Sequence, residues 1–112
     1  MKKPVVLVLA VSALAACFSL PALAAGNAES GKQKSQACAA CHGADGNKPM
    51  APDFPRIAGQ HQDYLYRALL DYKSGARKNP VMAGQVTNLS AQDLADLAAY
   101  FSSQKGPLHV IR

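Results

Sequence analysis

Residues 35–47 read SQACAACHGADGN, and this stretch limits what the chain can be. Cys38 and Cys41 stand three positions apart, and His42 directly follows the second cysteine. Such a group can be a redox-active dithiol, half of a zinc site or a covalent attachment point for haem. The choice among these chemistries depends on the compartment that the chain reaches and on whether a further metal ligand follows.

The N-terminal segment has the pattern of a secretory signal. Lys2 and Lys3 precede an apolar run over residues 5–16, which leads into a proline and several small residues. This order predicts a signal peptide over residues 1–24, cleaved after its last residue. A transmembrane anchor is the competing interpretation, but the apolar run is shorter than the roughly 20 residues that span a bilayer.

A second processing route is compatible with the same segment. The sequence Leu-Ala-Ala-Cys at residues 14–17 resembles the site at which bacterial lipoproteins are cut before a cysteine that is then lipidated. Acyl chains on Cys17 would associate the protein with a membrane. Cleavage after residue 24 is preferred, because a proline break leads into it. Both routes predict export to the periplasm.

Removal of the signal leaves residues 25–112 as one small domain. A chain of 88 residues has little apolar surface to bury, so it is expected to need a disulfide, a metal or a cofactor as part of its core. Ten basic residues face seven acidic ones in this part of the chain, a net charge of +3. This mild excess lacks the clustered arginine and lysine of nucleic-acid-binding proteins.

Helical patterns dominate the remaining sequence, and no alternating run is long enough for a strand. A polar, alanine-rich helix is expected over about 28–40. A second helix is expected over 61–75, where apolar residues recur at spacings of three and four. The third begins at Ser90, where Asp93 completes a capping box, and ends before Gly106.

Two long segments between these helices, residues 43–60 and 73–88, are rich in turn-forming residues and are expected to be irregular. Loops of this length are unusual in so small a domain unless they enclose something. We therefore expect an all-α domain in which the loops surround a large apolar ligand.

The helical pattern and the supply of metal ligands decide among the three chemistries. Dithiol motifs of the thioredoxin type lie near βαβ units, which this sequence does not show. A structural zinc ion needs four ligands, whereas after His42 the only histidines are His61 and His109, neither of them paired. The spacing therefore predicts one haem c, attached through thioethers at Cys38 and Cys41, with the adjacent histidine on its iron.

A second axial ligand is needed if the iron carries electrons rather than binding gas or peroxide. Met82 is the preferred candidate, because a proline stiffens its approach and an Ala-Gly pair after it leaves room for the backbone beside the ring. Met50 fits better as a loop residue. His61, near a helix start, and His109, in the C-terminal tail, are weaker candidates.

Several features together resemble the class I c-type cytochromes. They are Gly31, the haem motif, Pro-Arg-Ile-Ala-Gly at 55–59, Pro-Val-Met at 80–82 and the helix from Leu94 to Phe101. The likeness covers nearly all of residues 26–104 and is greatest with one half of the periplasmic dihaem cytochromes. It implies the small class I fold, with three main helices and long loops around one haem, and His42 and Met82 as iron ligands.

The resemblance also implies roles for residues around the haem. Pro55 would offer its carbonyl oxygen to the axial histidine and so fix the imidazole, and Ile57 would pack on the ring. Gly31 would lie where the first and last helices cross, beside Tyr100 or Phe101.

Iron with two side-chain ligands has no open position for a substrate. The expected function is therefore one-electron transfer between redox protein donors and acceptors in a respiratory chain, rather than catalysis. Lys73, Arg77 and Lys78 form a basic cluster that could steer acidic partners or could be ordinary cations at a helix end. The alternatives are a haem subunit of a larger respiratory complex, and a sensor or peroxidase from which Met82 dissociates.

Overall fold

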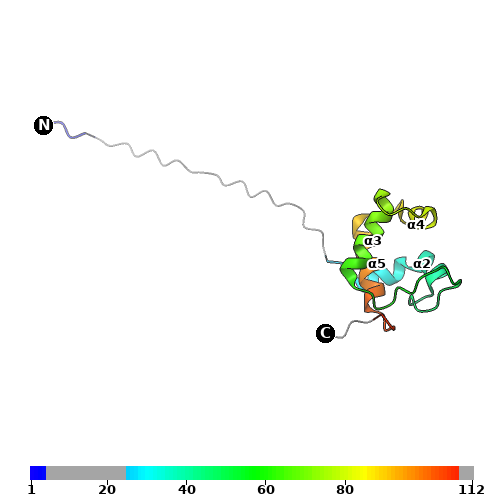
Figure 1. The fold of residues 1–112 in the computed structure, drawn as a ribbon. Coiled ribbons are helices and arrows are strands. Elements are labelled where there is room, and N and C mark those ends of the chain that lie inside the picture. Colours follow the sequence, from blue (N-terminus) through cyan, green and yellow to red (C-terminus); the bar gives the residue numbers. More distant parts are fainter. Residues whose placement is uncertain (5–24, 109–112) are drawn as a thin grey trace.

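The computed structural model describes residues 1–4 and 25–108, and every regular element within them is a helix (Figure 1). The helices are α1 (Ala28–Lys34), α2 (Gln36–His42), α3 (Gln62–Ser74), α4 (Pro80–Val86) and α5 (Ala91–Ser103). The all-α class is therefore confirmed. The described residues hold two short helices beyond the simple three-helix prediction.

Some predictions fall outside the described residues. The expected signal peptide lies mostly within 5–24, which also holds Cys17, and His109 lies in 109–112. Cleavage and lipidation therefore stay predictions. Among the helices that the structure describes, none is long and apolar enough to cross a membrane.

The first expected helix is in fact two, because Ser35 interrupts it. Both the backbone N–H and the hydroxyl of Ser35 donate to the carbonyl oxygen of Lys32, at 3.3 and 2.8 Å. A serine hydroxyl that bonds to the preceding turn competes with the helical ladder. The chain then restarts as α2, which ends at Gly43 with φ 88°. The haem motif therefore lies on a helix of its own, separate from α1.

The expectation that residues 73–88 are wholly irregular is wrong, because Pro80–Val86 forms α4. The side chain of Asn79 accepts hydrogen bonds from the backbone N–H groups of Val81 and Met82, at 3.0 and 3.1 Å. Proline in the first turn needs no donor of its own there. The Asn-Pro pair is therefore a helix start as well as a loop signal.

The last helix, α5, is the centre of the core. It begins with the predicted capping box, in which Ser90 and Asp93 each bond to the other's backbone N–H. Its core face joins Leu65 of α3 through Leu97 and Phe101. Helix α5 packs chiefly against α1 and α3.

Helices α1 and α5 cross at Gly31, as expected. A Cβ atom built there would meet the backbone of Asp96 and the Cβ of Tyr100, so no larger residue allows this approach. Asp96 is 4% exposed, and its carboxylate accepts from the backbone N–H of Asn27 and from Lys34 Nζ, at 2.8 and 2.7 Å. Lys34 also pairs with Asp93, at 2.8 Å. We call this set of interactions the α1–α5 crossing.

The two short helices lie at the edge of this core. Helix α2 makes its main helix contacts with α1, and α4 makes its own with α3. In Figure 1 both project from the same side of the α3–α5 pair. Each has one buried residue, His42 in α2 and Val86 in α4. The helices that carry the predicted iron ligands thus have the weakest packing against other helices.

Candidate functional site

Helix α2 presents two free thiols one helical turn apart. Cys38 and Cys41 are both partly buried, and Cys38 packs against the hydrophobic core. Burial raises the pKa of the Cys38 thiol above its usual range. Reactive dithiols depend on a lowered thiol pKa, so this environment disfavours a redox switch.

His42 is the last residue of α2 and is 6% exposed. Its Nδ1 lies 2.7 Å from the carbonyl oxygen of Pro55, so the hydrogen bond implied by the family resemblance is present. Because a carbonyl oxygen can only accept, Nδ1 carries the proton, and Nε2 has the free lone pair that a metal needs. The Phe54 ring lies 6.3 Å from the imidazole and is tilted by 59°.

The loop after α2 holds Pro55 in place through backbone hydrogen bonds. The carbonyl oxygen of Gly46 accepts from the N–H groups of Ile57 and Ala58, at 2.9 and 3.3 Å. The N–H of Gly59 donates to the carbonyl oxygen of Phe101, at 2.9 Å, which ties the loop to α5. Gly46 has φ 79°, a conformation that favours glycine. The Pro55 carbonyl oxygen, which accepts from His42, is thus held in place by backbone hydrogen bonds of the residues that follow Pro55.

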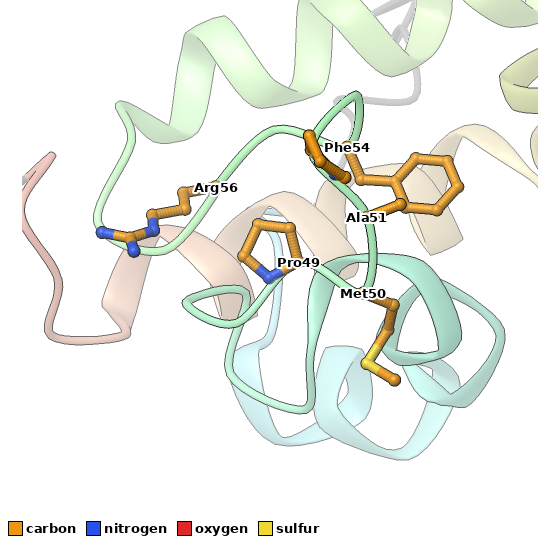
Figure 2. A pocket seen from close by; sticks show the side chains of 6 residues that line it. Pro49, Met50, Ala51, Phe54 and Arg56 are labelled. Atoms are coloured by element: carbon orange, nitrogen blue, oxygen red, sulfur yellow. The ribbon is translucent and has the colours of Figure 1, made fainter.

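The same loop carries an open hollow on its surface (Figure 2). Its walls are Pro49, Met50, Ala51, Pro52, Phe54 and Arg56. Figure 2 shows Arg56 extending away from Phe54 and Met50. Met50 is 71% exposed, which agrees with its interpretation as a loop residue. Phe54 is the wall residue that also stands beside His42.

Met82 lies in α4, where it is partly buried. Helices α2 and α4 are not among the principal helix pairings of the described residues, so Met82 and His42 come from separate parts of the edge of the core. His61 is exposed and directly precedes α3 without capping it through its side chain.

A group of partly buried apolar residues borders the core between these helices. Its members come from α2, the loop, α3 and the α4–α5 connection: Cys38, Ile57, Tyr66, Leu69 and Leu89. Apolar side chains that pack on the core yet stay partly exposed are suited to being covered by a large apolar group. The two thiols of α2 suit thioether attachment of haem c, and an imidazole nitrogen and a methionine sulfur are ligand types that its iron takes.

Sequence patterns missed two residues near the candidate site, Phe54 and Tyr66. Phe54 precedes Pro55 directly but shows no periodicity that would connect it with His42. Tyr66 lies in the helix expected over 61–75, in which Tyr64, two residues earlier, is 51% exposed. The spacing of Tyr66 and Leu69, three residues apart, was the available signal.

The predicted basic cluster is partly used within the domain. The Arg77 guanidinium lies 4.9 Å from the centroid of the Tyr72 ring, and its Nη1 lies 3.5 Å from the Tyr64 hydroxyl. Lys73 Nζ bonds to two backbone carbonyls. Within the described residues, Lys78 is the member without such an interaction. The contacts of Lys73 and Arg77 are with neutral groups, so all three side chains keep their charge and steering of partners stays a prediction.

Comparison with known proteins agrees with the fold and with the haem attachment motif. The model of the family described as cytochrome c matches residues 28–105. The chain therefore belongs to the cytochrome c family, and its Cys38-to-His42 segment is the haem c attachment motif of that family.

The relatives are cytochromes of two sizes. The chain is 57% identical over 82 residues to cytochrome c4 of Pseudomonas aeruginosa, which covers 73% of this chain and 40% of that protein. It is 42% identical to cytochrome c-554(548) of Halomonas halodenitrificans, across 72% of this chain and 100% of that protein. The chain thus spans about two fifths of the cytochrome c4 relatives it matches and the whole of a smaller one.

A solved structure gives the same result. Reduced recombinant cytochrome c4 from Pseudomonas stutzeri superposes with a TM-score of 0.69 at 50% identity, over 73% of this chain and 47% of that chain. The predicted resemblance to one half of a larger cytochrome is confirmed.

Proposed function

We propose that this protein is an exported one-electron carrier, with haem c bound through Cys38 and Cys41 and its iron ligated by His42 and Met82. The bound haem supplies a one-electron iron couple, and the protein supplies ligands and an apolar enclosure. The observation that carries the proposal is the hydrogen bond between His42 Nδ1 and the Pro55 carbonyl, 2.7 Å long. It directs the other ring nitrogen to metal binding.

The surroundings of His42 suit a carrier because they limit movement. The imidazole is buried, is held at Nδ1 and has the Phe54 ring beside it. The acceptor belongs to a loop that is itself bonded to α5 through Gly59 and Phe101. A ligand held in this way keeps its orientation when the charge on the metal changes.

The partners we propose are redox proteins of the periplasm. Among the relatives is a protein named thiosulfate dehydrogenase electron acceptor from Thiomonas intermedia, 40% identical over 99 residues, across 88% of this chain and 44% of that protein. That name supports a donor enzyme that releases electrons to a cytochrome. The secretory pattern of residues 1–24 supports the periplasmic location.

Mass spectrometry and optical spectroscopy of the purified full-length protein test the proposal. We expect a mature chain that starts at residue 25 and carries one haem. The oxidised protein should show the weak long-wavelength band of methionine-ligated ferric haem, and the reduced protein should bind carbon monoxide poorly.

Two methionine variants identify the ligand. Met82→Ala should lose the long-wavelength band and bind carbon monoxide readily, because an axial position opens. Met50→Ala is the matched control and should behave like the wild type, since Met50 is 71% exposed. A Met82→Ala protein that keeps the band would contradict the ligand assignment. Ready carbon monoxide binding by the wild type would favour a sensor or peroxidase.

A further inference from the structure

Helix α4 has few interactions of its own to hold it. It is seven residues long, and Val86 is its one fully buried residue. Isolated helices of this length are unstable in water. Its first turn is capped by Asn79, and its main helix contact is with α3. The orientation of α4 therefore depends on what is attached to its C-terminal end.

That attachment comes from Lys73, in the last turn of α3. Lys73 Nζ donates to the carbonyl oxygens of Thr87 and Leu89, at 2.8 and 2.6 Å. These residues belong to the short connection between α4 and α5. The same connection packs on the core through Leu89.

The ammonium group of Lys73 is directed to carbonyls rather than to an acid. Among the described residues, the ion pairs formed by carboxylates involve Lys34 and not Lys73. A cation near the C-terminal end of a helix interacts favourably with the unpaired carbonyls and the helix dipole. Hydrogen bonds from an ionised donor are also stronger than neutral ones. Lys73 thus joins α3 to the end of α4 by two charge-assisted bonds.

We propose that Lys73 is a positioning residue for Met82: it holds the C-terminal end of α4 against α3 and thereby sets where the methionine lies. The inference rests on the proposed function, because it takes Met82 as an iron ligand. It assigns Lys73 a role inside the domain, in holding α4, that does not depend on a partner protein.

Displacement of the methionine by imidazole tests this role in the oxidised holoprotein. We compare the wild type with two variants. Lys73→Met has a side chain of similar length without the ammonium donor, and Lys73→Arg keeps the charge and the hydrogen-bond donors. Lys78→Met is the matched control, because it removes the same charge from a side chain that makes no hydrogen bond or ion pair within the described residues. Amide hydrogen exchange of α4 is measured on the same four proteins.

Lys73→Met should bind imidazole about three- to tenfold more tightly than the wild type, with faster amide exchange in α4. Lys73→Arg should recover most of the difference, and Lys78→Met should match the wild type. Wild-type imidazole affinity and α4 exchange in Lys73→Met would overturn the positioning role while leaving methionine ligation intact. Equal effects in Lys73→Met and Lys78→Met would also overturn it, because they would reflect charge alone. A wild type without the methionine-to-iron band would instead overturn the ligand assignment, and the positioning role with it.

Discussion

The α1–α5 crossing and the pair of short helices α2 and α4 hold their places in different ways. At the crossing, Gly31 allows backbone contact, and Asp96 collects hydrogen bonds from Asn27, Lys34 and Gln92. Helices α2 and α4 leave the proposed methionine ligand and the thiols only partly covered, and His42 is the proposed ligand that is buried. The crossing is complete as protein packing, whereas α2 and α4 leave the thiols and Met82 partly exposed, as the proposed cofactor requires.

Removing the cofactor should produce the largest effect, and it tests most directly whether α2 and α4 depend on haem more than the crossing does. The double variant Cys38→Ala with Cys41→Ala cannot form thioethers, so it should be recovered without covalent haem and with much of its helical signal lost. A domain of this size has little other core to rely on. Circular dichroism and amide exchange check this: protection should vanish in α2 and α4 first. Full retention of α4 protection without haem would contradict the distinction between the two regions.

Gly31→Ala should disturb the crossing itself. The added Cβ would meet the Asp96 backbone and Tyr100, which should lower the free energy of unfolding by about 2 kcal/mol. Denaturant unfolding of the holoprotein measures the change. Gly84→Ala is the control, because a Cβ at that position would meet nothing within 4 Å outside its own helix backbone and chain neighbours. Equal stability of the Gly31→Ala and Gly84→Ala proteins would show that α1 and α5 can move apart at the crossing without loss of stability.

Asn79→Ala should act on α4 and leave the crossing unchanged. The side chain caps two backbone N–H groups at the start of α4, and loss of such a cap costs about 1 kcal/mol. Amide exchange should therefore rise within Pro80–Val86 and stay unchanged in α1 and α5. Asn88→Ala, at an exposed position after the helix, is the control. A uniform rise in all helices would mean that α4 is not an independent unit.

Acid should weaken the crossing to the smallest extent. The Lys34 ammonium, together with the capping bonds at Ser90, holds the pKa of Asp93 at about 2, below its ordinary 3.8. Because the folded-state pKa is lowered, the stabilisation is present above pH 4 and is lost as pH falls toward 2. Lys34→Met should flatten this part of the stability profile in denaturant unfolding at several pH values.

The control for the acid experiment is Lys32→Met, which removes the same charge from the same helix. Lys32 has no side-chain bond to Asp93, so its variant should keep the wild-type slope between pH 4 and pH 2. An unchanged slope in Lys34→Met would show that the Ser90 bonds alone lower the carboxyl pKa.

The features that sequence alone determined are those whose partners are close along the chain. The haem motif places two thiols and an imidazole within one turn and a half of helix, whatever surrounds them. The Ser90–Asp93 capping box involves residues three apart. Gly31 was placed correctly through the family resemblance, because a glycine at a helix crossing is required by the close approach itself.

Tertiary structure decided the features whose partners are distant. The two carbonyls held by Lys73 lie 14 and 16 residues further along the chain. The hydroxyl of Ser35 could have pointed to solvent, and its bond to Lys32 divides the predicted helix. From sequence, the Asn79–Pro80 pair is equally compatible with a loop. Packing of α4 against α3 in the folded chain favours the helix. Hydrogen bonds and packing of this kind depend on which groups the fold brings within reach, and residue order does not specify that.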